Sequence, residues 1–200
     1  MKFIINQGGL VQITSGNATM GPITMNGGTL SIAASASTQF APYELSSLTV
    51  AGTSPSTISD AIGFSGNTSG INLTINAAAN ARMPIDVSAT GSGGPDLIIS
   101  AVMINSGNSQ NPAGFVKTGN GIMEITAVNI FTGPINVGAG AALLDGDGQL
   151  GAGIYPGNMV ISNGASFIFA STQTQTNLGV LSGAGTLVIS NTTGPGSRSW

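Results

Sequence analysis

The chain has 200 residues, enough to bury a real hydrophobic core, yet only 6% of them are charged, while 41% are hydrophobic and 31 are Gly. Charge this sparse excludes most disordered tails and predicts a surface of Asn, Ser, Thr and Gln, which suit closely stacked β-strands better than exposed helices. Because Cys and His are absent, the chain also lacks a disulfide framework, a thiolate nucleophile, an ordinary zinc site and a Ser-His-Asp triad.

Apolar residues alternate with polar ones wherever the pattern is clear, and a period of two predicts short β-strands. Turn residues such as Asn26-Gly27 and Asn163-Gly164 separate the strands. The best stretch with helical spacing, residues 76–81, is too short for a stable helix. In chain order, the predicted strands contain residues 10–13, 23–25, 30–32, 48–50, 71–75, 85–87, 135–137, 159–161, 167–169 and 187–189.

No stretch of the sequence has the pattern of a membrane span or of a complete signal peptide. Residues 1–5 begin like a signal peptide, but Asn6-Gln7-Gly8-Gly9 ends the apolar run far short of an h-region. No run approaches the length of apolar sequence that a membrane span needs, so we expect no transmembrane segment in this chain. If the protein is exported, its signal has been removed, lies upstream of a fragment or is of another kind.

One segment of the chain recurs. Residues 13–23 return 112 positions later as 125–135, with Ile-Thr at the start and Gly-Pro-Ile at the end of both copies. A fainter copy at 183–190 lies 64 positions after 119–126. These offsets are near five and three multiples of roughly 21 to 22 residues, a coil length typical of solenoid repeats. Among a sandwich, a barrel and a solenoid, the repeat therefore favours a β-solenoid with about 20–22 residues per coil and about nine coils.

A parallel β-solenoid accounts for the composition. Coils about 4.8 Å apart satisfy each other's backbone hydrogen bonds, and the inward side chains stack into one apolar column. Charged side chains would stack on like charges, whereas Asn, Ser and Thr can form neutral hydrogen-bonded ladders and Gly can turn the corners. We therefore expect residues 1–200 to form a single domain, with the least regular repeat at 34–113.

Residues 114–151 resemble a known family. The run from Gly114 to Thr126, GFVKTGNGIMEIT, is similar to the G-L-x-K-x-G-x-G-T-L-x-L-x-G that opens the autotransporter-associated β-strand repeat. Residues 129–137, NIFTGPINV, are similar to its N-T-Y-T-G-x-T-x-V, and residues 140–151 to its closing G-x-L-x-L and L-G. The chain departs from the pattern at Ile122-Met123, at Ala127 or Val128 and at Ala142, and none of these changes would break a coil.

The resemblance implies a right-handed parallel β-helix in the passenger region of a type V secreted, cell-surface protein of a Gram-negative bacterium. In that family a separate C-terminal barrel attaches the rod to the outer membrane, so this chain would be a fragment of a longer passenger. The implied function is that of a non-enzymatic structural or adhesive rod segment, extracellular or at the bacterial cell surface. Its expected partners are a host or neighbouring-cell surface, a glycan, or other copies of itself by end-to-end or lateral stacking.

Two other functions stay open. The first is a subunit that stacks end to end into an extracellular filament, because residues 10–13 and 187–189, near the two ends, carry no charged gatekeepers. The second is a carbohydrate-active β-helix enzyme, which needs two carboxyl groups within reach of each other. The acidic residues weighed for that role are spread over separate predicted coils: Asp60, Asp86, Asp96 and Glu124.

We assign no residue a catalytic, cofactor-binding or metal-binding role and expect no cofactor. The Arg82/Asp86 pair is interpreted as a surface ion pair. Asp145-Gly146-Asp147-Gly148 begins like a calcium loop but lacks the later bidentate acid, so we predict a solvated turn. The glycines at 119, 121, 183 and 185 are predicted to turn corners, since no helix pattern and no Gly-Lys-Ser/Thr follows them.

The remaining residues of note have simpler interpretations. At a net charge of −3, the scattered basic residues form no patch for nucleic acid or another phosphate-rich partner. The basic residues are Lys2, Arg82, Lys117 and Arg198. Most aromatic side chains are expected to pack in the core: Phe64, Phe115, Phe131, Tyr155, Phe167 and Phe169.

Overall fold

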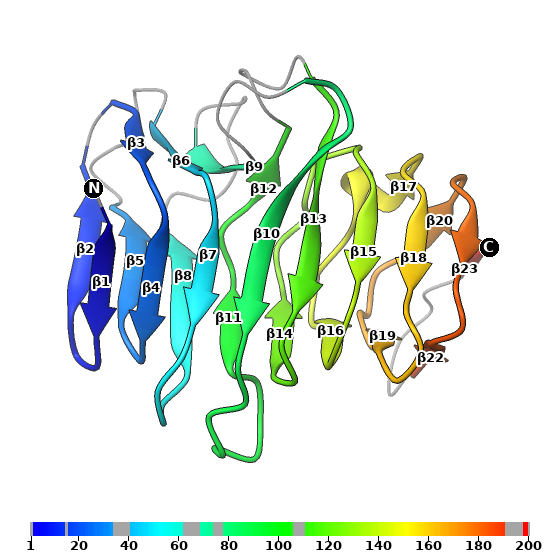
Figure 1. Cartoon of the computed structure of the whole chain (residues 1–200). Helices are drawn as coiled ribbons and strands as arrows, with labels where there is room; N and C mark the ends of the chain where they lie inside the picture. Colours follow the sequence, from blue (N-terminus) through cyan, green and yellow to red (C-terminus); the bar gives the residue numbers. More distant parts are fainter. Residues whose placement is uncertain are drawn as a thin grey trace.

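Each coil of the protein contains up to three short strands, and each strand pairs with its counterparts in the coils before and after it (Figure 1). The computed structural model describes residues 2–14, 16–33, 41–61, 69–73, 78–105, 111–190 and 198–199. Over these residues the chain forms eight coils, and every pairing between named strands is parallel. The predicted all-β, parallel β-helical fold is therefore confirmed.

Two eight-stranded sheets run the whole length of the stack. Sheet A contains β1 (Phe3–Asn6), β4 (Ile23–Asn26), β7 (Leu48–Val50), β10 (Ala81–Val87), β13 (Ala113–Thr118), β15 (Ile135–Val137), β18 (Met159–Ile161) and β21 (Leu181–Ser182). Sheet B contains β2 (Leu10–Ile13), β5 (Thr29–Ile32), β8 (Ser56–Asp60), β11 (Leu97–Ile99), β14 (Ile122–Ile125), β16 (Ala141–Leu144), β19 (Ser166–Phe169) and β22 (Thr186–Ile189).

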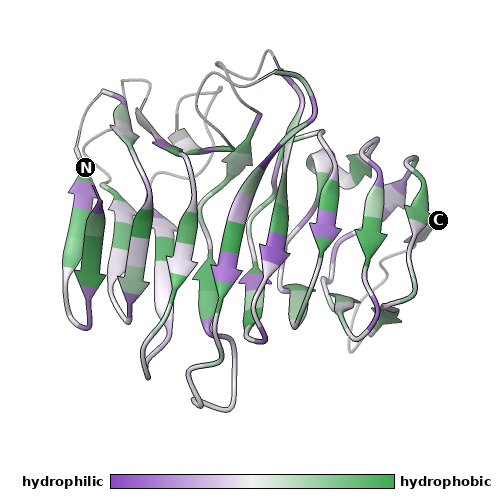
Figure 2. Ribbon diagram, in the orientation of Figure 1, coloured by the Kyte–Doolittle hydropathy of each residue, from purple (hydrophilic) through white to green (hydrophobic). Residues whose placement is uncertain are grey.

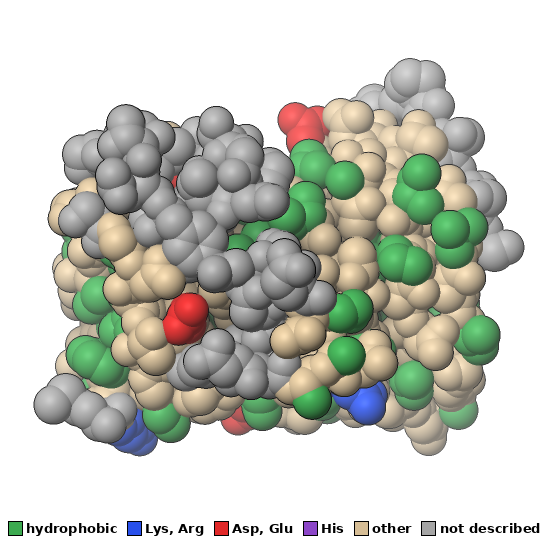
Figure 3. All heavy atoms as spheres, turned by 90° about the horizontal axis from the view of Figure 1, so that it is seen from above, with side chains coloured by type: hydrophobic (Ala, Val, Ile, Leu, Met, Phe, Trp, Pro, Cys, Tyr) green, Lys and Arg blue, Asp and Glu red, His purple; other side chains and the backbone are tan. Residues whose placement is uncertain are grey.

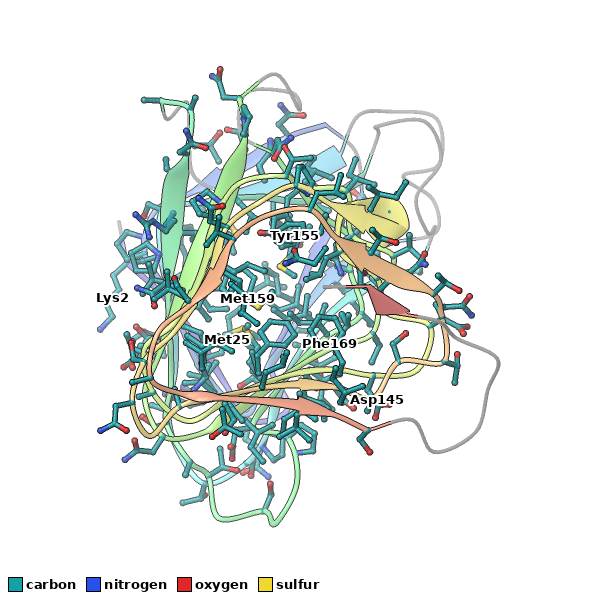
Figure 4. The ribbon with its side chains drawn as sticks, turned by 90° about the vertical axis from the view of Figure 1, so that its right-hand side faces the viewer. Lys2, Met25, Asp145, Tyr155, Met159 and Phe169 are labelled. Carbon is teal, nitrogen blue, oxygen red and sulfur yellow. The ribbon has the colours of Figure 1, made fainter. Side chains whose placement is uncertain are left out.

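Two shorter sheets form the third side of the coils. In the first half of the chain this side holds β3 (Ala18–Met20), β6 (Ala41–Leu45), β9 (Ser69–Leu73) and β12 (Met103–Ile104). In the second half it holds β17 (Ile154–Tyr155), β20 (Gln175–Asn177) and β23 (Arg198–Ser199). Seen from the C-terminal end, the chain runs counterclockwise as it advances toward the viewer, so the coil is right-handed (Figure 4).

Coil length varies more widely than the repeat suggests. Phe3 pairs with Ile23, a step that agrees with the predicted coil. Leu48, in contrast, pairs with Ile85, a step nearly twice as long, and Ile85 pairs with Lys117 after another long step. Part of the added length is the connection of residues 88–96 between β10 and β11, which forms the loop at the bottom of Figure 1.

The longer coils change the meaning of the internal repeat. Ile13 ends β2 and Ile125 ends β14, and four steps along sheet B separate these strands. The longer offset of the repeat therefore spans four coils and not five, and the chain has eight described coils and not nine. The shorter offset spans three coils, from β14 to β22, as predicted.

The core lies inside the coils and follows from the alternation along each strand (Figure 2). In β7, Leu48 and Val50 point inward and are buried, whereas Thr49 between them is only half-buried. The strand register stacks inward residues of successive coils on one another, as in the column Ile5, Met25, Val50 and Val87. Because each inward residue covers the one before it, one continuous apolar core fills the whole stack.

Aromatic rings fill the wider part of this core. Phe131 packs edge-to-face on Phe115 and on Tyr155, with ring centroids 5.8 and 5.7 Å apart, and Phe167 stacks on Phe169 at 4.7 Å. All five side chains are buried, as predicted, and Figure 4 shows Tyr155 and Phe169 pointing into the coil. Phe64 lies outside the described residues.

Buried amide side chains join the coils where the third side has no regular strand. The side-chain oxygen of Asn129 accepts the Met103 N–H at 2.8 Å, and its Nδ2 donates to the carbonyl oxygens of Ala127 and Gln149. Gln175, two coils later at the start of β20, binds both the N–H and the carbonyl oxygen of Leu150 in the coil before it. Each amide thus replaces backbone hydrogen bonds that a strand would have made.

Candidate functional site

Asp86 and Asp96 lie on opposite sides of the connection between β10 and β11. Asp86 accepts a hydrogen bond from the Thr118 hydroxyl at 3.0 Å. Asp96 is buried, and its carboxylate accepts the N–H and hydroxyl of Thr90 and the N–H of Ile122 at 2.6–2.7 Å. Burial acts to raise the pKa of Asp96, but these hydrogen bonds and the charge of Lys117 outweigh it and lower the pKa. Asp96 is therefore an ionised structural clamp between two coils.

Glu124 and Asp145 form a carboxyl pair that the sequence analysis did not identify. The two residues lie on adjacent coils, since Glu124 pairs with Leu143 and Asp145 follows two positions later. Burial, then the charge and side chain of Asp145, raise the pKa of Glu124. Their spacing along the sequence equals one predicted coil, and this was the signal that could have revealed the contact.

This pair does not have the geometry of a glycosidase site. The two carboxyl groups of such an enzyme stand about 5 Å apart or more, which leaves room for the substrate between them. The Asp145 side chain instead lies close enough to Glu124 to raise its pKa directly.

The segment from Asp145 to Gly148 is a turn, as predicted. The Gly148 N–H donates to the Asp145 carbonyl oxygen at 2.9 Å, and Gly146 and Asp147 are exposed. The Asp147 carboxylate accepts the side-chain N–H of Gln173 at 2.8 Å, which fastens the turn to the next coil. Within the described ranges, no group of three His, Cys, Asp or Glu side chains comes close enough to hold a metal ion.

The predicted ion pair between Arg82 and Asp86 is wrong. Both residues lie on β10 and point outward, but four positions in an extended strand separate their Cα atoms by about 13 Å. The carboxylate of Asp86 contacts Thr118, and among the residues that the structure describes no acidic group pairs with Arg82. Within this part of the chain, the exposed guanidinium of Arg82 therefore has no counter-charge.

Lys117 is the most unusual side chain of the core. It is fully buried in a column of sheet A, between Ile85 of the preceding coil and Val137 of the following one. Its ammonium group donates three hydrogen bonds, to the carbonyl oxygens of Gly119 and Gly121 at 2.6 Å and of Ala139 at 2.9 Å. All three of its donors are used, so the charge is solvated by the backbone of two coils.

The corner that Lys117 holds is made by glycine, as predicted. Gly119 has a φ of +73°, in the left-handed region that side chains with a Cβ rarely adopt. A Cβ at Gly121 would lie 2.6 Å from the Ser88 carbonyl oxygen of the coil before. Gly183 and Gly185 stand at the equivalent corner between β21 and β22. These glycines turn the chain between strands and form no phosphate-binding loop.

The outer face of sheet A carries a hollow with a volume of about 360 Å³. It lies beside the N-terminal ends of β10 and β13, which are longer than β15 and β18 and extend past them (Figure 1). Elsewhere the surface is mostly uncharged, and Figure 3 shows only scattered charged groups on the face seen from above. The hollow is lined mainly by Asn80, Arg82, Thr132, Pro134, Pro156 and Asn158.

Comparison of the chain with family models, with curated proteins and with solved structures finds no match in any of the three. The described part of the chain contains no helix long and apolar enough to cross a membrane.

We predict that Lys117 makes stability rise with pH above pH 8. Burial lowers the pKa of Lys117 from 10.5 to about 8, against the opposing charges of Asp86 and Asp96. Between these two values the unfolded chain keeps a proton that the folded chain has lost, so the free energy of unfolding increases with pH. From pH 8 to pH 10 the expected gain is about 1–2 kcal/mol, measured by urea unfolding followed by circular dichroism.

The Lys117→Met variant is the control, because Met fits an apolar column and does not titrate. Its free energy of unfolding should not rise over the same range and should fall slightly toward pH 10, because Tyr43 and Tyr155, whose pKa burial raises, begin to ionise in the unfolded chain alone. The range stops at pH 10 because burial raises the pKa of Tyr43 to about 12, so ionisation of this tyrosine in the unfolded chain lowers stability at higher pH. An equal rise in both proteins would show that Lys117 is not its source.

Proposed function

We propose that the chain is a non-enzymatic structural and adhesive rod segment of a bacterial cell-surface or secreted protein of the autotransporter type. The observation that supports it best is that buried polar side chains hydrogen-bond to the backbone of adjacent coils. Lys117, Asp96 and Asn129 all bind the backbone of neighbouring coils, and all three are buried. The chemistry of the interior is used to hold one coil to the next, which suits a rod.

The outside of the molecule supports the same proposal. Eight coils about 4.8 Å apart give a stack on the order of 40 Å long. Its sides carry few charges and mix polar outward residues such as Thr49 with apolar ones such as Ile168. Each coil contacts chiefly its neighbours, so the same architecture can be lengthened by further coils. The resemblance of residues 114–151 to the autotransporter-associated repeat adds the proposed location, outside the cell and attached through a region other than this chain.

We predict that antibodies raised against the purified chain label intact, unpermeabilised cells that express the full-length protein. External protease should remove the label, whereas a cytoplasmic marker should resist the protease and stay unlabelled. Label that appears only after lysis would contradict the proposed location. Release of sugars from glycans by the purified chain, abolished by Asp145→Asn or Asp86→Asn, would contradict the non-enzymatic role and support the alternative of a carbohydrate-active enzyme.

Self-association is a second candidate function, favoured by a difference between the two ends of the stack. Leu181 and Ile189 occupy core positions, opposite the buried Met159 and Phe169, yet they are 37% and 49% exposed. In the first coil the inward residues are better covered: Ile5 and Ile13 are 3% and 7% exposed, and Phe3 and Val11 are half-buried. An open core at one end favours pairing of two copies through that end, whereas a filament needs two open ends.

We predict that the purified chain dimerises with increasing concentration and that Ile189→Lys keeps it monomeric, because a charge at the core opposes burial of the end. Sedimentation velocity measures this directly. Ile154→Lys is the matched control, since Ile154 is 59% exposed on the side of the sixth coil and should not alter the dimer. A monomer at all concentrations would contradict self-association, and long fibres in electron micrographs would support the filament instead.

A further inference from the structure

We propose that the hollow on sheet A binds an acidic sugar unit, such as a hexuronate, through Arg82, whose guanidinium has no counter-charge among the described residues. This inference rests on the proposed function and deepens it, because it names a ligand class for one face of the rod. The volume of about 360 Å³ falls within the range of small-ligand sites.

The strand register explains why the surface is hollow at this place. Arg82 pairs with Gly114, and the register of the following coils continues this row to Pro134 and Asn158. A Cβ at Gly114 would overlap the Pro134 carbonyl oxygen, so no side chain can occupy this position of the row. Arg82 and Asn158 therefore stand about 14 Å apart, three strand spacings, across a floor without long side chains.

Arg82 brings a positive charge that the hollow does not neutralise. Among the described residues, no acidic one lines the hollow. Asp86, the acidic residue of the same strand, lies four positions further along and is bound by Thr118. An exposed guanidinium is ionised at every physiological pH and presents five N–H donors, which match a carboxylate in bidentate geometry.

The other polar groups of the hollow favour an acceptor-rich ligand as well. The side-chain oxygen of Asn158 already accepts the Val180 N–H at 2.9 Å, which leaves its Nδ2 group to donate. The Thr132 hydroxyl oxygen already accepts the Asn105 side-chain N–H at 3.1 Å, so this acceptor is occupied. Donors at both ends of the hollow therefore face a ligand whose hydroxyl and carboxylate oxygens accept.

The walls between these donors are apolar. Pro134, Pro156 and Val160 provide flat or branched hydrocarbon surface on the side of the hollow away from Arg82. A pyranose ring has an apolar face that can lie on such a surface while its rim of oxygen atoms meets donors. The arrangement of one cation, amide donors and an apolar wall therefore fits a carboxylated sugar.

An acidic peptide fits the same charge less well. Extended peptides bind sheets by adding a strand to an open edge, where their backbone can be paired. The strands beside the hollow, β10, β13, β15 and β18, each have a partner on both sides and offer no edge. The sugar is thus the favoured ligand, and the peptide becomes an outcome of the test.

The test is a calorimetric titration of the purified full chain with a short oligogalacturonate. Binding should be saturable, and Arg82→Gln should weaken it about tenfold or more, as expected for loss of charged hydrogen bonds. Asn158→Asp keeps the oxygen that holds Val180 but puts a negative charge into the hollow, so it should weaken binding as well. Lys2→Gln is the matched control, because Lys2 is an exposed cation that points away from the stack (Figure 4).

Three further probes separate the possible ligands: a neutral galactan oligomer, a sulfated dextran oligomer and a poly-glutamate peptide. The proposal predicts the tightest binding for the oligogalacturonate and none measurable for the neutral oligomer. If Arg82→Gln changes the thermal midpoint, Arg82→Lys replaces it, since it keeps the charge but loses the bidentate fork and should bind with intermediate affinity.

The proposal is overturned if no saturable binding is found, if the neutral oligomer binds as tightly, or if Lys2→Gln has the same effect as Arg82→Gln. Tighter binding of poly-glutamate or of the sulfated oligomer would overturn the carboxylated sugar as the ligand. If binding fails while antibodies still label intact cells, the ligand is wrong and the surface rod stands. If binding succeeds without labelling, the site stands and the location is wrong.

Discussion

Vertical stacking in register is the constraint on which the structure depends. In a parallel β-helix each residue lies against the equivalent residue of the next coil, about 4.8 Å away, so every side chain must tolerate a neighbour placed above or below it. Apolar side chains inside, and uncharged polar or apolar side chains outside, meet this condition. Charged side chains do not, because like charges would repel along the whole stack. The scarcity of charge in the sequence follows directly from this geometry.

The exceptions show how much the stack depends on satisfied polar groups. Lys117 interrupts an apolar column, yet it is accommodated because three carbonyl oxygens of a glycine corner surround its ammonium group. Asn129 stands where a regular strand is missing and replaces its hydrogen bonds to three coils. In both cases a buried polar side chain takes over the bonding that stacked backbone normally provides, so the coils stay joined where the repeat is irregular.

The fold could be predicted because its signals are local and repeated. Alternation of apolar and polar residues fixes which side of a strand faces inward, and the copies at 13–23 and 125–135 indicate stacked coils. Coil number could not be predicted correctly, because extra residues between strands lengthen the middle coils without leaving a repeat. Aromatic core residues such as Phe131 were also predictable, because Phe is among the residue types most often buried.

The surface sites were harder to predict, for a reason that follows from the same geometry. Contacts between coils join residues that are a whole coil apart in the sequence, and because coil length varies, a small error in it pairs the wrong side chains. Arg82 and Asp86 look like partners in the sequence, but an extended strand holds them apart. Glu124 and Asp145 look unrelated and are in contact. The hollow could not be seen at all, because it arises from one glycine that leaves a gap in a row of four coils.

The account is tested most directly by a disulfide across two coils, which the cysteine-free chain makes straightforward. Thr24 and Thr49 pair in the observed register on the outer face of sheet A, so a Thr24→Cys/Thr49→Cys variant should oxidise readily to an intramolecular disulfide. In Thr24→Cys/Ser31→Cys the two positions lie on different sheets, and no disulfide should form. The opposite result would show that β4 and β5 pair as a hairpin and that the coils are not stacked.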